Sequence, residues 1–469
     1  MIIMQTNKSD KLHEECGVFG ASFKESETAP LITYNGLISL QHRGQEGAGI
    51  ASLVDGKISC HRGVGLVGQV FPGDVLNNLP PSNLAIGHVQ YSSSGCRTAD
   101  DVQPIVTDFL TGRLSVVCNC SIVNSKALKS KLKAAGVKLY SKNSSEIIAN
   151  LIGLYSMQLG DFLQGTVKAA QELEGSFSIA VLTSDGKLIA LRDGSGFRPL
   201  CIGENKNGMV VASENCALDG CGFKFVRDLL PGEVVVLQDG KITYEKVEIT
   251  PKINDSGLCI FEYVYFARPD STVDGLNVFQ SRYRMGIALA KEHPVDADVI
   301  CGVPDSGLIA AMGYSRSSRI PLVSGFVKNR YLGRSFIYPT QLERESVVQL
   351  KLNPLRAEVE GKSVVMVDDS IVRGTTCARI VKLLKKAGAR EVHVRISSPP
   401  FKYICHFGTD IGSEKHLIAN QMEVAQIREK LGADSLGFIS LEGLKNACSG
   451  CTTAFCTKCF TGNGDLKLS

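Results

Sequence analysis

The sequence lacks several features that would assign it to a specialised class of protein. It contains no run of about 18 apolar residues, so no segment is expected to span a membrane as a helix. The first residues are too polar for the apolar region of a secretory signal. The excess of basic over acidic residues is only +4, which leaves no electrostatic footprint for nucleic acid. Repeats and low-complexity segments are also absent. We therefore expect a globular protein that binds neither a membrane nor a nucleic acid.

Cysteine is abundant by contrast, with 16 residues in a chain of 469. In a large chain with no export signal, this count indicates metal binding or catalysis more than disulfides, and it favours a reducing, cytoplasmic location. The length predicts two or three domains of about 100–200 residues each. A hydrophobic fraction of 44% and a charged fraction of 21% are those of an ordinary globular protein.

Short strand-like runs dominate up to about residue 250. Each run is bounded by Gly, Asp or Asn, and clear examples are Ser178–Leu182, Leu188–Leu191, Met209–Ala212 and Glu233–Leu237. A helix is predicted over Ser144–Gln158, because its apolar residues recur on one face. This half of the chain is therefore expected to be an α+β domain rich in antiparallel sheet.

From about residue 280 the pattern changes to strand, loop and helix. Strands are predicted at Val299–Val303, Ser363–Val367 and Val392–Ile396. A helix that ends at Gly388 lies between the last two strands. Strand–helix–strand units at this spacing predict a parallel sheet, in which ligands bind at the carboxyl ends of the strands.

The strongest signal in the chain is the segment Val364–Thr376. A buried strand ends in Asp368 and Asp369, and then Gly374, Thr375 and Thr376 open a helix. Free backbone N–H groups at a helix start bind phosphate, and paired carboxylates suit sugar hydroxyls or a hydrated Mg²⁺. The alternative is a capped helix after a buried strand. Two consecutive acids at that position would be unfavourable without a cation or hydroxyl partner.

This segment resembles the phosphoribosyl pyrophosphate (PRPP) motif of type I phosphoribosyltransferases. Gly302–Gly307 then resembles the pyrophosphate loop of that fold, although alone it reads as an ordinary turn. The basic segment Lys328–Arg334 is either a solvated loop or a source of counter-charge for the phosphates of PRPP. We favour the second interpretation.

These three segments lead to a more specific resemblance: the chain resembles the amidophosphoribosyltransferase family nearly from end to end. The resemblance also rests on four further segments, Glu15–Gly20, Gln41–Glu46, Arg192–Leu200 and Glu262–Asp270. It implies a propeptide at 1–15 and an N-terminal-nucleophile (Ntn) hydrolase domain at 16–250, with four αββα layers. An α/β type I phosphoribosyltransferase domain with a parallel sheet and a cysteine-rich tail would follow at 251–469.

The implied activity is formation of 5-phosphoribosylamine from PRPP and glutamine-derived ammonia, the first step of purine synthesis. The substrates would be small molecules, and a homo-oligomer, a tetramer by resemblance, would be formed. Mg²⁺ is expected near Ser306, Asp368 and Asp369. The resemblance implies PRPP binding by Asp305, Ser306, Gly307, Lys328, Arg330, Asp368, Asp369, Arg373, Gly374, Thr375 and Thr376.

For the Ntn domain the resemblance implies that Cys16 is the nucleophile and Asn119 an oxyanion donor. After loss of the propeptide, the α-amino group of Cys16 would act as the base, because its pKa lies near neutrality. Taken alone, Cys16 would be interpreted as a buried free thiol, and it is the surrounding motif that favours the nucleophile.

Three positions depart from the family pattern. Gln90 replaces an Arg that pairs the glutamine carboxylate, and Ser144 replaces an Asp that holds the amino group. Cys120 replaces the glycine of the oxyanion pair. Loss of two charge-assisted bonds of about 1.5–3 kcal/mol each would weaken glutamine binding by roughly 10²–10⁴. We therefore expect a weak or absent glutaminase. Ammonia-dependent transfer, a silent paralogue that binds PRPP or nucleotides, and transfer to another nucleophile remain alternatives.

Four cysteines match, by their flanking sequence, the ligands of a structural [4Fe–4S] cluster in one branch of the family. They are Cys259, Cys405, Cys456 and Cys459. The competing interpretation is a zinc site made by Cys448, Cys451, Cys456 and Cys459. We prefer the cluster, because the gap between the two pairs is shorter than is usual in zinc ribbons.

Overall fold

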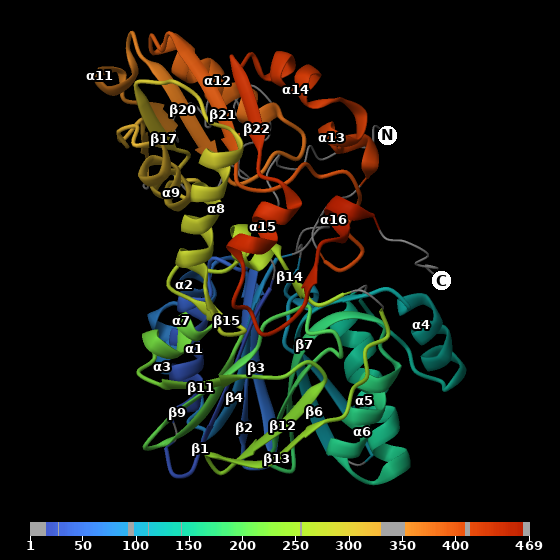
Figure 1. Ribbon diagram of the computed structural model, residues 1–469. Coiled ribbons are helices and arrows are strands. Elements are labelled where there is room, and N and C mark those ends of the chain that lie inside the picture. The colour runs from blue at the N-terminus through green and yellow to red at the C-terminus, as the bar shows by residue number, and fades with distance from the viewer. Residues whose placement is uncertain are drawn as a thin grey trace, which may run out of the picture.

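The computed structural model describes eight stretches of the chain: residues 16–26, 28–91, 98–110, 112–141, 143–253, 256–329, 352–408 and 413–462. Arg330 and the rest of the basic segment after Asn329 lie outside these residues. The first half of the chain forms a sandwich of two sheets, and the second half forms a smaller α/β unit above it (Figure 1).

Two antiparallel sheets form the centre of the first half. The seven-stranded sheet has the order β11 (Lys224–Asp228), β9 (Cys201–Asn205), β10 (Gly208–Ala212), β1 (Gly17–Phe23), β4 (Leu84–Gln90), β2 (Gly47–Val54) and β3 (Lys57–Val64). The six-stranded sheet has the order β13 (Lys241–Val247), β12 (Glu233–Gln238), β8 (Leu188–Arg192), β7 (Gly175–Thr183), β6 (Gly112–Ile122) and β5 (Ile105–Phe109).

Helices cover the outer face of each sheet, so that four layers result. The seven-stranded sheet packs on α1 (Ala29–Ser39), α2 (Val67–Val70) and α7 (Asn215–Gly220), beside α3 (Gly73–Asn77). The six-stranded sheet packs on α4 (Ser125–Ala134), α5 (Ser144–Leu159) and α6 (Phe162–Glu172). A third apolar core fills the space between the sheets. The αββα order of an Ntn hydrolase domain is therefore confirmed.

The second half is built on a parallel sheet of order β17 (Val299–Gly302), β20 (Ser363–Asp368), β21 (Glu391–Ile396) and β22 (Ser435–Phe438). Alternate residues of β20 point to opposite faces. Val365 and Val367 pack with α8 (Val278–Glu292), α9 (Leu308–Ser318) and α15 (Leu441–Ala447). Val364 and Met366 pack with α12 (Thr375–Lys386) and α14 (Val424–Leu431). This confirms the expected α/β unit with a parallel sheet.

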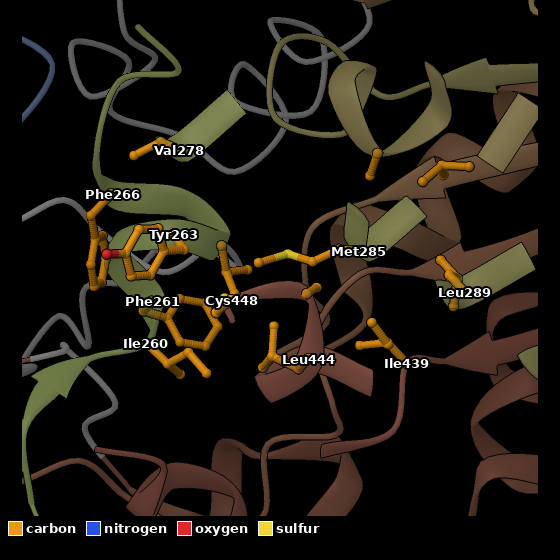
Figure 2. Packing of buried hydrophobic residues seen from close by; sticks show 14 of the residues in the cluster. Ile260, Phe261, Tyr263, Phe266, Val278, Met285, Leu289, Ile439, Leu444 and Cys448 are labelled. Atoms are coloured by element: carbon orange, nitrogen blue, oxygen red, sulfur yellow. The ribbon is translucent and has the colours of Figure 1, made fainter. Parts of the chain in front are cut away.

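Short elements complete the second half. They are β14 (Leu258–Cys259), a π-helix (Glu262–Phe266), β15 (Thr272–Val273), β16 (Leu276–Asn277), β18 (Phe326–Lys328), β19 (Leu352–Pro354), α11 (Arg356–Val359), α13 (Ile418–Gln421), β23 (Phe455–Cys456) and α16 (Lys458–Thr461). Figure 2 shows the aromatic end of the core beneath the sheet. There Phe261, Tyr263 and Phe266 lie near Cys448 and Met285. The segment that follows the first half, from Phe261 to Phe266, is thus part of the core of the second half.

All the strands and helices predicted above are confirmed to within a few residues at each end. The helix predicted at Ser144–Gln158 is α5, and the strand predicted at Ser178–Leu182 lies within β7. Among the described residues, no helix is both long enough and apolar enough to cross a bilayer.

Candidate active sites and domain junction

The two predicted phosphate loops leave adjacent parallel strands at the same edge of the sheet. Gly302 at the end of β17 lies opposite Val367 of β20, and the N–H of Val303 donates to the Val367 carbonyl at 2.8 Å. The hydroxyl of Ser306 donates to Asp368 Oδ1 at 3.3 Å, which joins the two loops directly. The strand order therefore brings residues 305–307 and 368–376 together.

Asp368 and Asp369 are both almost completely buried. The Asp369 N–H donates to Asp368 Oδ1 at 3.0 Å, and the Ser370 hydroxyl donates to Asp369 Oδ1. Two adjacent carboxylates at the end of a buried strand form a dense group of hard oxygen donors. Together with Ser306 they fit the preference of Mg²⁺ for oxygen ligands.

Glycine is required on both loops for steric reasons. A Cβ atom on Gly307 would lie 2.2 Å from the Val367 carbonyl oxygen. Gly374 has φ of +85° and immediately precedes α12, whose first residues are Thr375 and Thr376. The chain thus approaches the helix start in a conformation that favours glycine, and a helix start of this kind is suited to bind an anion.

The basic segment is described only as far as Asn329. Lys328 ends β18, and its Nζ lies 2.5 Å from Asp305 Oδ2, on the opposing loop. Arg373 lies between the carboxylate pair and Gly374. The structure therefore brings the predicted binding residues together, except Arg330, whose position is outside the described residues.

In the first half, Cys16 lies just before β1. Its thiol donates to the Tyr91 carbonyl at 3.4 Å, and Arg43 Nε donates to the Cys16 carbonyl at 3.3 Å. Burial raises the pKa of the Cys16 thiol to about 11, against the opposing effects of the Tyr91 hydrogen bond and the Arg43 charge. A thiol in this environment needs a base to become a nucleophile.

Asn119 lies on β6, in the sheet opposite the one that carries β1. It is 4% exposed, and its Nδ2 is buried with no hydrogen-bond partner among the described residues. On the neighbouring sheet, His88 Nε2 donates to the Cys118 carbonyl at 3.0 Å, which ties β4 to this part of β6. A buried donor without a partner is suited to bind an oxyanion.

The side chain of Gln90 is used within the protein itself. Its Nε2 donates to the Asp101 carbonyl at 2.7 Å, and its Oε1 accepts from the Gln103 N–H at 3.0 Å. Ser144 opens α5 directly after the cap Asn143. Cys120 forms a disulfide with Cys118, a pairing that the sequence did not suggest.

A buried charged network joins the two halves, and sequence reasoning missed it. Arg43 donates to Glu262 in the π-helix at 2.7 and 3.0 Å and to Glu214 at 2.5 Å. Burial opposes ionisation of Glu214, but His42 and Arg43 hold the pKa of that carboxyl well below its usual range. Gln41–Glu46 and Glu262–Asp270 were both noted as motifs, yet nothing in the sequence paired them.

Arg282 on α8 is a second buried cation near the domain junction. This buried guanidinium donates to the carbonyl oxygens of Tyr263 and Ala267, each at 2.8 Å. Burial lowers the pKa of Arg282 to about 10, and the charge of Asp369 acts in the opposite direction. Arg282 therefore holds the backbone of the π-helix that carries Glu262, and it lies within electrostatic range of Asp369.

The four cysteines expected to hold a cluster lie at this junction. Cys259 of β14 pairs in register with Cys456 of β23, and the N–H groups of Lys402 and Tyr403 donate to the Cys459 carbonyl. Burial, followed by the charges of Cys259, Cys405 and Cys456, raises the pKa of the Cys459 thiol well above its usual range. In the described part of the chain, no three His, Cys, Asp or Glu side chains are arranged to hold a metal ion as they stand.

Cys448 and Cys451 lie in a different environment. The Tyr263 hydroxyl donates to Cys451 Sγ at 3.5 Å, and burial followed by the charge of Cys451 raises the pKa of Cys448. The thiols that influence Cys459 do not include these two. The charges that raise the pKa of Cys459 thus link it to the three other cysteines of the expected cluster.

The fold and the site together define a two-domain enzyme class, in which an Ntn hydrolase fold is joined to a phosphoribosyltransferase fold. A glutamine amidotransferase domain model matches residues 90–220, and a phosphoribosyl transferase domain model matches residues 283–397. The chain is 42% identical to the amidophosphoribosyltransferase of Methanocaldococcus jannaschii over 466 residues, covering 97% of this chain and 98% of that protein. It is 44% identical to the Bacillus subtilis amidophosphoribosyltransferase, covering 97% of this chain and 95% of that protein.

A similar solved structure is glutamine PRPP amidotransferase from B. subtilis in complex with ADP and GMP. It matches with a TM-score of 0.86 and 43% identity, over 95% of this chain and 96% of that one. A structure described as the allosteric regulatory enzyme of purine biosynthesis matches with a TM-score of 0.87, at 42% identity and 95% coverage of each chain. This chain therefore belongs to the amidophosphoribosyltransferase family.

Proposed function

We propose that this protein transfers nitrogen to C1 of PRPP, forming 5-phosphoribosylamine and releasing pyrophosphate, at the entry to purine synthesis. The observation that carries the proposal is the Ser306–Asp368 contact, which joins the pyrophosphate loop to the carboxylate pair across adjacent parallel strands. The match to amidophosphoribosyltransferases over nearly the whole chain supports the same reaction.

Each loop has a distinct part in holding PRPP. The segment from Arg373 to Thr376, at the start of α12, receives the 5-phosphate, because the N-terminus of a helix favours an anion. Asp368 and Asp369 accept hydrogen bonds from the ribose hydroxyls, and Asp305–Gly307 cradle the pyrophosphate. Lys328 and Arg330 supply counter-charge. Ser306, Asp368 and Asp369 would hold Mg²⁺, which neutralises charge on the leaving pyrophosphate when bound.

The glutaminase half is proposed to be weak, with free ammonia as the more effective donor. The Gln90 side chain is a neutral amide that offers no positive charge to a substrate carboxylate, and it is already hydrogen-bonded to Asp101 and Gln103. Ser144 offers no negative charge to an amino group. Cys16 remains the proposed nucleophile and Asn119 its oxyanion donor, with residues 1–15 as a propeptide that must be removed to free the α-amino base.

The test is pyrophosphate release from PRPP by anaerobically purified protein, supplied first with ammonia and then with glutamine. The proposal requires Mg²⁺-dependent release with ammonia. A silent paralogue would release no pyrophosphate with either donor, and this outcome would contradict the proposed reaction. Intact mass of the same sample reports whether residues 1–15 have been removed, and light scattering tests the tetramer.

A [4Fe–4S] cluster on Cys259, Cys405, Cys456 and Cys459 forms the second part of the proposal. The β14–β23 pairing and the mutual influence of the four thiols support it, and iron would stabilise the deprotonated thiolates that burial disfavours. Such a cluster fits the reducing cytoplasm that we propose for this enzyme, and it would fasten the C-terminal segment to the boundary near residue 250.

Cys459→Ser and Cys448→Ser form a matched pair of variants for this cluster. Iron and acid-labile sulfide should fall to background in Cys459→Ser and stay at the wild-type level in Cys448→Ser. Zinc in place of iron, lost equally in both variants, would contradict the cluster and support the alternative site.

A further inference from the structure

Residues 213–215, which lead from β10 into α7, contact both halves of the molecule. In Figure 1 this segment lies where α7 meets β15, at the boundary between the halves. Ser213 and Glu214 are each 1% exposed, so their polar atoms must be satisfied within the protein. None of the sequence motifs identified above includes these residues.

The two oxygen atoms of the Glu214 carboxylate divide their shortest contacts between the halves. Oε1 accepts from Arg43 Nη1 at 2.5 Å and lies 2.7 Å from His42 Nε2, both in the first half. Oε2 accepts from the Arg268 N–H at 2.9 Å and from the Ser271 hydroxyl at 2.6 Å, both in the second half. A single buried carboxylate therefore bridges the two halves.

The residues on either side of this carboxylate extend the bridge in both directions. The Val18 N–H donates to Ser213 Oγ, and the Ser213 N–H donates to the Val18 carbonyl, each at 2.9 Å. On the other side, Asn215 Oδ1 accepts from the Thr272 N–H at 2.6 Å. The segment thus joins the start of β1 to β15.

Arg43 connects Glu214 to Cys16. Its Nε donates to the Cys16 carbonyl at 3.3 Å, while its Nη1 donates to both Glu214 and Glu262. The direction of Nε is therefore fixed by the carboxylates that hold the other end of the planar guanidinium. Because Glu214 is one of the two, the backbone at Cys16 depends on it.

We propose that Glu214 is a positioning residue for Cys16, and that it makes the position of the Cys16 segment depend on residues 268–272 of the second half. The relevance to glutamine chemistry rests on the proposed function, because it requires Cys16 to be the nucleophile. The coupling between the two segments does not depend on that role.

Alkylation by iodoacetamide measures the environment of Cys16 without requiring enzyme activity. Trypsin releases Cys16 on a peptide that ends at Lys24 and contains no other cysteine. Cys60 is the internal reference, because cleavage after Lys57 and Arg62 isolates it and burial raises the pKa of both thiols to about 11. General unfolding would raise both alkylation rates together, whereas loss of positioning raises only that of Cys16.

Glu214→Gln keeps the shape of the side chain and removes its charge. In the full-length protein at pH 8, alkylation of Cys16 relative to Cys60 should become about tenfold faster, because a hydrogen bond to a charged group shifts a local opening equilibrium by about this factor or more. Glu233→Gln is the matched control, since Glu233 is also buried and paired with an arginine, but within the first half. It should leave the rate at the wild-type value. Equal rates in Glu214→Gln and wild type would overturn the proposal.

Ser271→Ala tests the coupling between the halves with a milder change. It removes one donor to Glu214 from the second half, so alkylation of Cys16 should become about fivefold faster. Ser281→Ala is the matched control, because Ser281 is also fully buried in the second half and its hydroxyl donates to the Asn277 carbonyl at 3.0 Å. The same Cys16 rate in these two variants would refute the coupling.

The pH profile of alkylation tests the route through Arg43. Arg43 and Glu46 are the charged side chains that act on the Cys16 thiol, and Arg43 lowers its pKa. Glu214→Gln leaves Arg43 with one fewer acidic partner, so its charge should act more strongly on Cys16. The midpoint should therefore fall further in Glu214→Gln than in Ser271→Ala, which keeps both charges. A midpoint that stays at the wild-type value in Glu214→Gln would overturn this route.

Cys16→Ala separates this proposal from the proposed function. Loss of the residual glutamine hydrolysis in this variant would support Cys16 as the nucleophile. Hydrolysis at the wild-type rate would refute that role, and the alkylation rates of the other variants would still decide whether Glu214 positions the Cys16 segment.

Discussion

Arg43 and Glu262 form a bidentate ion pair, with hydrogen bonds of 2.7 and 3.0 Å, that crosses from the Ntn half to the transferase half. Both side chains are fully buried. Arg43 also donates to the carbonyl of Cys16. Arg43, which hydrogen-bonds the residue just before β1, is therefore held by the π-helix of the other half.

Arg43→Met should destabilise the protein by about 3–5 kcal/mol, because it leaves the Glu262 carboxylate buried without its partner and removes one of the cations that pair with Glu214. Urea denaturation of anaerobic protein measures the change. Arg113→Met is the matched control, since Arg113 also forms a bidentate pair, with Asp108, but both of these side chains are exposed. It should lose at most about 1 kcal/mol. Equal losses in the two variants would contradict a special role for the buried pair.

Gly307→Ala should abolish pyrophosphate release with ammonia while leaving the fold intact. The added Cβ would lie 2.2 Å from the Val367 carbonyl, so the pyrophosphate loop must move away from β20. Steady-state assays with PRPP measure the effect. We expect the rate to fall by more than about 100-fold, because a small displacement of the groups that position a substrate slows the reaction strongly. Gly68→Ala in α2 meets no atom within 4 Å and should retain full activity. If Gly307→Ala retained wild-type activity, the pyrophosphate of PRPP would have to bind at another place than this loop.

The buried His88 side chain should lower the free energy of unfolding in acid. Burial lowers its pKa from 6.5 to about 3, so between these values the unfolded chain binds more protons than the folded one. Its contribution to stability is present above about pH 6.5 and is lost as the pH falls toward 3.

The measurement for His88 is urea denaturation at pH 7 and pH 5. Wild type should lose about 1–2 kcal/mol more than His88→Gln over this interval, because the amide cannot take up the proton. His61→Gln changes an exposed histidine and should follow wild type. A loss in His88→Gln as large as in wild type would show that His88 does not titrate in this way.

Much of the fold was predictable because its signals are local. Short strand-like runs bounded by Gly, Asp or Asn located β7 and β10, and the run from Val364 to Thr376 located β20 and the start of α12. The two phosphate loops were also predictable, since parallel strands deliver their carboxyl ends to one edge.

The domain junction was not predictable, since it depends on side chains far apart in sequence. Arg43 and Glu262 are 219 residues apart, and neither position shows which partner it meets. The Cys118–Cys120 bridge was missed for a different reason. Residues i and i+2 of a strand point to the same side, so the two thiols could have been paired from the predicted strand. No role was predicted for Cys118, however, and Cys120 was considered only as a replacement for glycine.

Restoring the missing charges should restore glutamine use. Gln90→Arg combined with Ser144→Asp should raise glutamine-dependent turnover by about 10²-fold, because each charge-assisted bond contributes about 1.5–3 kcal/mol. Ammonia-dependent turnover should stay constant and serves as the internal control. No gain in the double variant would mean that the absence of these charges does not limit glutamine use.

The most direct measurement is the ratio of glutamine-supported to ammonia-supported pyrophosphate release in one anaerobic preparation, at saturating Mg²⁺ and PRPP. The account predicts sustained pyrophosphate release with ammonia. With glutamine it predicts a rate at least about 100-fold lower, as expected for a site with no charged side chain at Gln90 or Ser144. Equal rates with the two donors would contradict the weak glutaminase, and no release with ammonia would contradict the proposed transferase.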